Sequence, residues 1–92
     1  MILSYLHKGL KELFEKKRSA KIDSRMHQRI IIVLDALDQA RRPEDMNIPG
    51  LDFHPLRGFT PTRYTVHIDG PWCVTFQFEG ENAKRVNFEQ YH

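Results

Sequence analysis

The chain has 92 residues, of which 40% are hydrophobic and 28% charged, with one Cys, five Gly and five Pro. This length predicts one small domain over residues 1–92 and excludes a dinucleotide-binding domain with a second domain beside it. The lone Cys73 excludes an internal disulfide, and the five His residues are too scattered for a zinc site. The net charge of +2 is unevenly placed, because residues 1–42 carry ten Lys and Arg against five Asp and Glu, whereas residues 43–92 carry four against seven.

Membrane insertion and secretion are not expected. The longest uninterrupted apolar run, residues 30–34, is far shorter than the roughly 20 residues that cross a bilayer. The first eight residues lack the charged start, apolar centre and cleavage site of a secretory signal. We therefore expect a cytoplasmic protein with no membrane partner.

The first half predicts two helices. Residues 2–5 are compatible with a short strand, and one apolar stripe at helical spacing follows, formed by Leu6, Leu10, Leu13 and Phe14. Residues 16–21 show no apolar period and form a basic connector.

A second helix is predicted after the connector. Asp23 or Ser24 can cap it, because either side-chain oxygen can accept a free backbone N–H. Its buried stripe consists of Met26, Ile30, Val33, Leu34 and Leu37, and Pro43 ends it because proline has no N–H to donate. The segment 43–53 holds two Pro and a Gly among acidic residues and is predicted to be a loop.

From residue 63 onward the pattern alternates with a period of two, which predicts strands. Apolar residues alternate with polar ones over 64–69 and 72–78, separated by a turn at Gly70-Pro71, and again around Val86 and Phe88. The fold class is therefore α+β, with two N-terminal helices packed on one face of a small, mostly antiparallel sheet. The other face is predicted to be polar and to carry His67, Cys73, Thr75, Gln77, Arg85, Asn87, Glu89 and Tyr91.

The segment 54–58, His-Pro-Leu-Arg-Gly, is the first candidate site. Pro55 restricts its own backbone and that of His54, so we expect a stiffened turn that holds His54 and Arg57. An imidazole that titrates near neutral pH beside a permanent cation suits chemistry at a phosphate. The alternative is a turn in which both side chains only make local hydrogen bonds.

The segment 87–92 is the second candidate site. Tyr91 and His92 follow a predicted strand and would bring a phenol and an imidazole to one edge of the sheet. The alternative is a frayed tail without a function.

Both segments belong to a set of motifs that extends along nearly the whole chain and resembles the HigB toxins of bacterial type II toxin–antitoxin pairs, within the RelE/ParE fold group. The matching motifs are His7-Lys8-Gly9-Leu10-Lys11, Leu13-Phe14-Glu15, Leu37-Asp38 with Ala40, Ile48-Pro49-Gly50, His54-Pro55-Leu56-Arg57-Gly58, Trp72 with Thr75-Phe76-Gln77-Phe78, and Tyr91-His92. Each motif is weak alone, but their order, spacing and total length are specific.

The resemblance implies a RelE-like toxin fold and a ribosome-dependent endoribonuclease that cuts mRNA in the ribosomal A site. It further implies no metal or other cofactor, a helix-turn-helix antitoxin of the HigA type, and contact with operator DNA only through that antitoxin. Cleavage would follow attack by the 2′-OH on the adjacent phosphorus, which needs a base, an acid and positive charge at the phosphate.

The resemblance also assigns roles to catalytic residues. His54 would act as acid or base. Arg57 stands where the family usually has Lys and would hold the phosphate oxygens, because its pKa is too high for a base. Tyr91 would stack on a base or help to activate the hydroxyl, and His92 is the second candidate for proton transfer.

The chain departs from the family pattern at two places. It has Pro71-Trp72-Cys73 where the family has Asn-Trp-Arg, and Gln90 where an acidic residue is usual. Loss of one fixed cationic donor would cost roughly 10²–10³ in rate, by analogy with an oxyanion-hole donor. We expect Arg63, Arg85 or His67 to supply the missing charge if they lie on the same face.

The remaining basic residues are predicted to bind RNA, although a solvated helix face is the alternative. This set comprises Lys16, Lys17, Arg18, Lys21, Arg25 and Arg29, with Arg63 and Arg85 on the sheet. Two other functions remain open. One is a catalytically attenuated binding module that acts through its antitoxin and operator DNA, as the Cys73 departure suggests. The other is a gyrase poison of the ParE type on the same fold.

Overall fold

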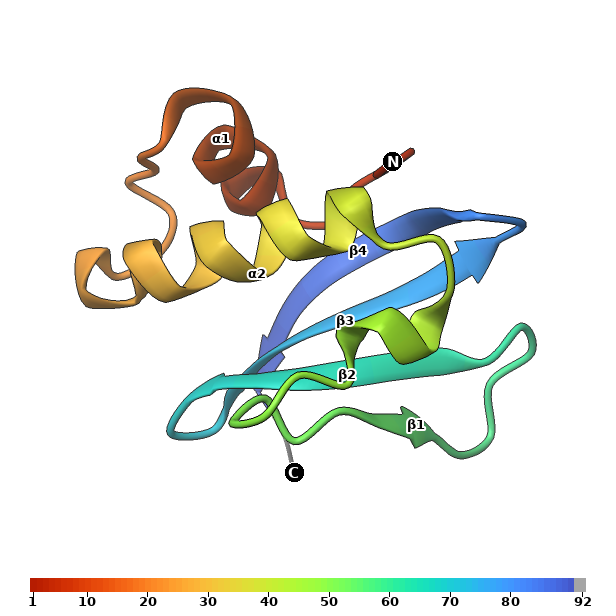
Figure 1. Cartoon of the computed structure of the whole chain (residues 1–92). Helices are drawn as coiled ribbons and strands as arrows, with labels where there is room; N and C mark the ends of the chain where they lie inside the picture. The colour runs from red at the N-terminus through yellow and green to blue at the C-terminus, as the bar shows by residue number, and fades with distance from the viewer. Residues whose placement is uncertain (91–92) are drawn as a thin grey trace.

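The computed structural model describes residues 1–90. Two layers are evident, because the helices lie on one face of an antiparallel sheet (Figure 1). In chain order the elements are α1 (Lys8–Lys16), the 3₁₀ helix η1 (Ser24–Met26), α2 (His27–Gln39), the 3₁₀ helix η2 (Pro43–Met46), β1 (His54–Leu56), β2 (Arg63–Asp69), β3 (Trp72–Glu79) and β4 (Asn82–Gln90). The predicted α+β class is confirmed. None of the helices within residues 1–90 is long and apolar enough to cross a membrane.

The first helix, α1, begins one residue after His7, whose Nδ1 accepts a hydrogen bond from the Gly9 N–H (3.0 Å). It ends where Lys17 takes the left-handed conformation and donates its N–H to the Leu13 carbonyl oxygen. Leu10 and Leu13 are fully buried, as predicted. Leu6 was wrongly included in the helical stripe, since it precedes the helix and is 47% exposed.

The second helix begins with one 3₁₀ turn, η1. Asp23 caps that turn by accepting the Arg25 N–H (2.9 Å), and hydrogen bonds from the Arg25 side chain and backbone lower the pKa of Asp23 to about 2. The predicted cap at Asp23 is thus confirmed. The helix α2 ends at Gln39, before Pro43, and its buried side chains are Ile30, Val33, Leu34 and Leu37.

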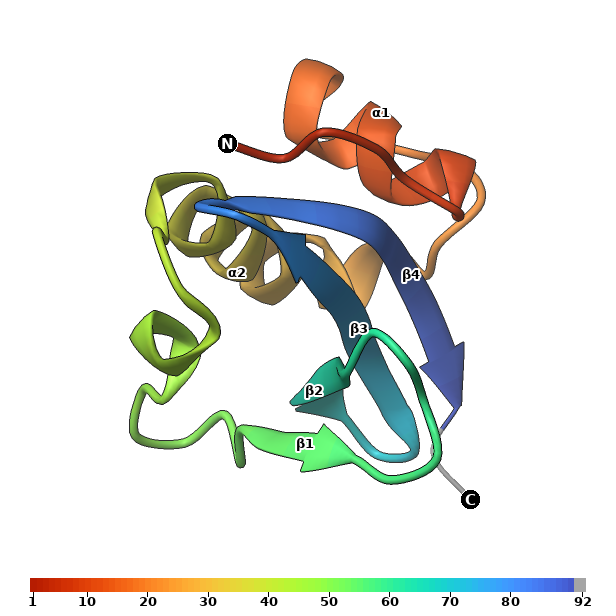
Figure 2. The same ribbon diagram turned by 90° about the vertical axis from the view of Figure 1, so that its right-hand side faces the viewer.

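The four strands form an antiparallel meander in the order β1-β2-β3-β4. Figure 2 shows that the sheet is strongly twisted, with β1 and β4 at its two edges. The side of the sheet that faces the helices supplies the sheet half of the core, namely Val66, Ile68, Val74, Phe76, Ala83, Val86 and Phe88.

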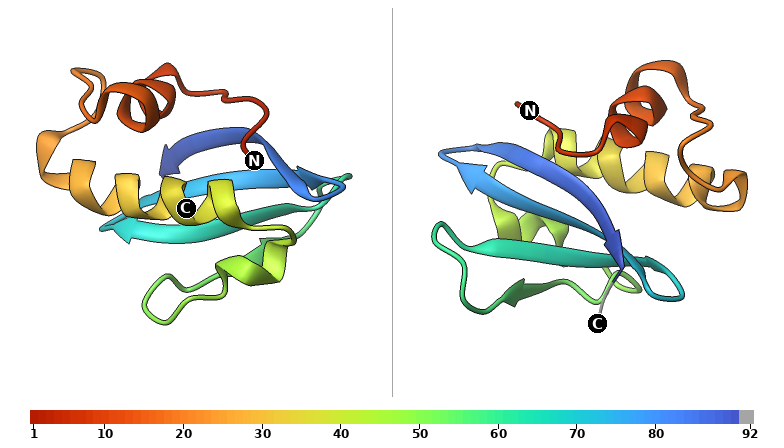
Figure 3. Two further views of the ribbon diagram at one scale, coloured as in Figure 1. Left: turned by 45° about the horizontal axis from the view of Figure 1, so that its top comes forward. Right: turned by 180° about the vertical axis from the view of Figure 1, so that it is seen from behind.

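The N-terminal residues do not form the predicted strand. Ile2 and Tyr5 make only isolated parallel bridges, to Ala83 and Val86 of β4. The segment nevertheless runs beside β4 (Figure 3), and Asp38 of α2 accepts the Ile2 N–H (3.0 Å). It therefore covers the outer edge of β4, where unpaired backbone groups would otherwise be exposed.

The prediction of a loop over 43–53 and a turn at 54–58 was wrong in two respects. Residues 43–46 form η2, whose Met46 is fully buried. His54–Leu56 is an edge strand paired with β2 in the register His54 to Thr65. Three residues are too few to show an alternating pattern, and a central Pro argues against a strand except at an edge, which is the position that β1 occupies.

Candidate functional site

Two hollows lie on the polar side of the sheet, away from the helices. The first, which we call the His54 pocket, has a volume of about 160 Å³ and is lined by Asp52, His54, Thr65, His67, Gly70, Pro71 and Cys73. The second, the Arg63 pocket, has a volume of about 260 Å³ and is lined by Leu6, Leu56, Phe59, Arg63, Gln77, Arg85, Asn87 and Glu89. Six residues of the predicted polar face line these pockets, His67 and Cys73 in the first and Gln77, Arg85, Asn87 and Glu89 in the second.

The imidazole of His54 is oriented by the backbone just before it. Asp52 takes a left-handed conformation (φ 49°), which Asp tolerates better than most residues, and its carbonyl oxygen lies 2.9 Å from His54 Nδ1. A carbonyl can only accept, so Nδ1 carries the proton of this hydrogen bond. In the neutral ring Nε2 is then the nitrogen that can accept a proton, which is the arrangement a general base requires.

Cys73 is buried on the polar face and cannot supply charge. Its Sγ lies 3.4 Å from the Glu89 carbonyl oxygen and donates to it. Burial raises the pKa of the Cys73 thiol, so the group stays neutral near pH 7. His67, which lies opposite Cys73, donates from Nε2 to the Gly70 carbonyl oxygen (2.9 Å) and stabilises the β2–β3 turn.

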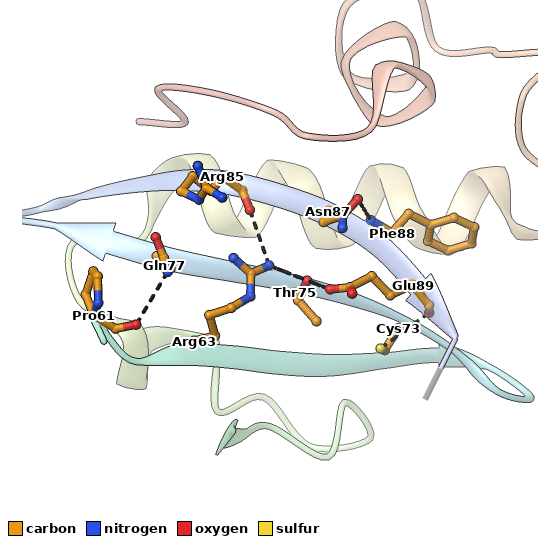
Figure 4. Close-up of polar contacts among 9 residues, drawn as sticks. All are labelled: Pro61, Arg63, Cys73, Thr75, Gln77, Arg85, Asn87, Phe88 and Glu89. Carbon is orange, nitrogen blue, oxygen red and sulfur yellow. Dashed lines mark hydrogen bonds and ion pairs between the residues drawn. The ribbon is translucent and has the colours of Figure 1, made fainter. Parts of the chain in front are cut away.

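Arg63 is unusual among the predicted site residues, because its side chain is only 7% exposed. Figure 4 shows it reaching from β2 across β3 toward β4. Its Nη2 donates to Thr75 Oγ1 (2.6 Å) and to the Arg85 carbonyl oxygen (3.4 Å), and it lies 3.7 Å from Glu89 Oε2. Thr75 Oγ1 also donates to the Glu89 carboxylate. Burial lowers the pKa of Arg63, but a guanidinium remains charged at any physiological pH.

The remaining catalytic candidates are not brought together by the described residues. Arg57 is exposed in the turn after β1 and is not among the residues that line the His54 pocket. Tyr91 and His92 lie outside the described residues. The last described residue of β4, Gln90, pairs with Trp72, the neighbour of Cys73.

The basic connector lies on the helical side of the sheet in every view, whereas β1 lies across the sheet from it (Figures 1 and 3). Lys16, Lys17, Arg18 and Lys21 are all exposed, and Lys21 pairs with Glu12 (3.3 Å).

The two arginines around the start of α2 lie differently. Arg25 borders a hollow with Asp69 of β2 and with Gly70 and Pro71 of the β2–β3 turn, and these two turn residues also line the His54 pocket. Arg29 donates to the Gly50 carbonyl oxygen (3.0 Å).

Comparison with known proteins identifies the family. The family of RelE-like toxins of the type II toxin–antitoxin system HigB matches residues 3–92. The chain belongs to this HigB-like family. A relative named endoribonuclease HigB, from Proteus vulgaris, is 36% identical over 92 residues and is covered completely, as is this chain. Proteins of this family are the toxins of toxin–antitoxin pairs, so an antitoxin is the expected class of partner for this chain.

Two groups on the polar face are suited to chemistry at a phosphate. His54 offers an oriented nitrogen for proton transfer, and Arg63 offers a fixed cation on the same face of the sheet. Within residues 1–90 no group of three or more His, Cys, Asp or Glu side chains is arranged to hold a metal ion.

Proposed function

We propose that this chain is a ribosome-dependent endoribonuclease that cleaves mRNA in the ribosomal A site in the cytoplasm. The observation that carries the proposal is the full-length similarity to a protein named endoribonuclease HigB. The orientation of His54, with Nδ1 bound to a carbonyl and Nε2 able to accept a proton, supports it.

Cleavage proceeds by attack of the 2′-OH on the adjacent phosphorus and departure of the 5′-oxygen. His54 takes or gives a proton, Arg57 holds the phosphate oxygens, Tyr91 stacks on a base or helps to activate the hydroxyl, and His92 is the second proton-transfer group. Two surfaces contact RNA. The polar face meets the messenger through Arg63 and Arg85, and the helical side meets ribosomal RNA through Lys16, Lys17, Arg18, Lys21, Arg25 and Arg29.

The test is cleavage of mRNA on programmed ribosomes by the purified protein, mapped by primer extension. We expect cuts within the A-site codon, none on the same mRNA without ribosomes, and a loss of about 10²–10⁴ in rate for His54→Ala. Intact ribosome-bound mRNA with wild-type protein would refute the enzymatic proposal. A separate supercoiling assay with gyrase and relaxed DNA would reveal a gyrase poison, since the protein would then inhibit supercoiling.

A second function is favoured by the neutral thiol of Cys73. The chain would then be a weak enzyme that acts mainly through binding to its antitoxin and, through it, to operator DNA. Expression of the wild-type and Cys73→Arg chains in the absence of antitoxin discriminates between the two. Strong growth arrest only with Cys73→Arg supports the binding module, whereas equal arrest refutes it.

The antitoxin in this proposal is a small helix-turn-helix protein. It binds the toxin and prevents its action on ribosomes, and it carries the complex to DNA. Co-expression with the protein encoded beside this chain tests the pairing, since a true antitoxin abolishes growth arrest and co-purifies with the chain.

A further inference from the structure

The guanidinium of Arg63 is buried and paired with one carboxylate, that of Glu89. A guanidinium that is 7% exposed loses most of its hydration, so a sequence retains it only where it is paired or used. Its partner Glu89 is 42% exposed and 3.7 Å away, which is longer than a close ion-pair hydrogen bond. Thr75 links the two groups, because its Oγ1 accepts from Arg63 and donates to Glu89.

The backbone of β4 is deformed next to this guanidinium. The β3–β4 register shifts between Thr75 and Gln77, and Arg85 takes a left-handed conformation (φ 52°) that is unfavourable for a residue with a Cβ. The carbonyl oxygen of Arg85 accepts from Arg63 Nη2 (3.4 Å). An irregular strand and a strained residue thus contribute to one contact, which holds Arg63 in place.

Within residues 1–90 the hydrogen bonds and the ion pair described for Arg63 all use Nη2, and its guanidinium lies 6.0 Å from the centre of the Phe59 ring. Arg63 also lines the Arg63 pocket of about 260 Å³, together with Arg85, the amides of Gln77 and Asn87, and Glu89. A hollow lined by two arginines and two amides suits an anion with several oxygens, such as a phosphodiester, which would compete with the Glu89 carboxylate for Arg63.

The register also places this cation close to His54. His54 pairs with Thr65, and Thr65 pairs with Thr75, the residue that Arg63 contacts at 2.6 Å. His54 and Thr75 are thus two strands apart, about 10 Å between backbones. A phosphodiester that reaches from the His54 pocket to the Arg63 pocket would contact both side chains.

We propose that Arg63 is a second catalytic cation, beside Arg57, that binds the non-bridging oxygens of the scissile phosphate, and that Thr75 and Glu89 are its positioning residues. This assignment rests on the proposed ribonuclease function and names the group that takes the place of an arginine at position 73. In the reaction the 2′-oxygen bonds to phosphorus, the bond from phosphorus to the 5′-oxygen breaks, and one proton moves from the 2′-OH to the leaving oxygen through protein groups. Arg63 forms no covalent bond, but it stabilises the dianionic transition state with hydrogen bonds.

The test compares the steady-state kinetics of cleavage of ribosome-bound mRNA by four chains: wild type, Arg63→Gln, Arg63→Lys and Arg41→Gln. Arg41 is an exposed arginine between α2 and η2 that lines neither pocket, so Arg41→Gln loses the same charge without touching either. We expect Arg63→Gln to lower kcat by about 10²–10³ with a smaller change in KM. Arg63→Lys keeps a charge without the fork and retains an intermediate rate. Arg41→Gln retains the wild-type rate.

A rescue experiment separates a catalytic from a structural role. Cys73 is two residues before Thr75 in β3 and therefore lies on the same face of the strand. An arginine at position 73 would thus reach the same phosphate. We expect Cys73→Arg to restore cleavage to the Arg63→Gln chain, while the melting temperature follows the Arg63 substitution alone. Glu89→Gln, which removes the anion opposite Arg63, is expected to lower KM and kcat together.

The outcomes distinguish this assignment from the proposed function. Absence of cleavage by the wild-type chain overturns both. Cleavage by the wild type with an equally fast Arg63→Gln chain overturns only the assignment. A slow, folded Arg63→Gln chain that Cys73→Arg does not rescue also overturns it, because the loss then comes from the structure of the face and not from the missing cation.

Discussion

Gly9 of α1 has no room for a side chain. A Cβ at this position would lie 2.8 Å from His7 Cε1 and 3.0 Å from Ile22 Cδ1. Glycine is normally about 1 kcal/mol worse than alanine in a helix. Here the methyl group would displace the His7 ring, which caps the helix by accepting the Gly9 N–H.

We therefore predict that Gly9→Ala lowers the free energy of unfolding by about 1–3 kcal/mol, the usual effect of overpacking, although helix propensity alone predicts a gain. Urea denaturation measures it. Lys11→Ala, at an exposed position of the same helix, is the control and should stay within about 0.5 kcal/mol of wild type. A more stable Gly9→Ala chain would contradict the packing described.

The cap at His7 also predicts a pH dependence. Burial lowers the pKa of His7, and Lys21 lowers it further, so the folded chain binds fewer protons than the unfolded chain, in which His titrates near about 6.5. The contribution of His7 to stability is then complete above that pH and is lost as the pH falls below it. Protonation of Nδ1 also removes the acceptor of the cap.

His7→Asn keeps an oxygen that can cap the helix but does not titrate. We expect the free energy of unfolding of this variant to fall less steeply than that of wild type between about pH 7 and pH 5. Chemical denaturation at several pH values gives both curves. Parallel curves would show that His7 does not titrate on unfolding.

The sequence indicates much of the site at the level of single residues, but it cannot indicate which of them are buried. His54 was a candidate because its type and neighbours suit proton transfer. Arg63 was a candidate for supplying charge, but its burial and its contacts were not predicted, because they depend on a diagonal reach from β2 to Glu89 on β4. A local pattern contains no information on side chains that meet across three strands.

Among the elements, η2 is the one whose importance is least evident from the sequence. Pro43 occupies its first turn, where a missing N–H costs nothing, and Met46 is fully buried against the core. We predict that Met46→Ala lowers the free energy of unfolding by about 2–5 kcal/mol. Glu44→Ala, an exposed change in the same turn, should cost less than about 0.5 kcal/mol.

Thermal and urea unfolding measure both variants. Equal stability of the two chains would mean that residues 43–46 are a solvated loop, as the composition of this segment predicts. The long elements could be predicted because α2, β2 and β3 repeat their apolar residues over two or more periods. The short elements η2 and β1 could not, since three or four residues show no period and are held by tertiary contacts.

At the scale of the whole molecule, the charge asymmetry corresponds to the two layers. The basic first half forms the helical layer, and the acidic second half forms the sheet (Figure 1). On the sheet, the exposed Arg85 and the buried Arg63 place positive charge at the polar face although the sheet half has a net charge of −3. A ribosome-bound enzyme with this distribution would contact ribosomal RNA through one layer and act on mRNA through the other.

This division predicts that connector charges and site residues affect different kinetic constants. Replacing Lys16 and Arg18 with Gln removes two exposed cations from the connector, across the sheet from β1. We expect KM for programmed ribosomes to rise and its slope against the logarithm of salt concentration to fall by about one to two, since each phosphate contact releases roughly 0.7–0.9 counterions. At saturating ribosome concentration kcat should match wild type, because the connector does not contact the His54 pocket.

The control with Lys8→Gln and Arg41→Gln removes the same charge elsewhere and should leave the salt slope unchanged. An equal change of slope in both double variants would mean that total charge, rather than the connector, guides the protein to the ribosome.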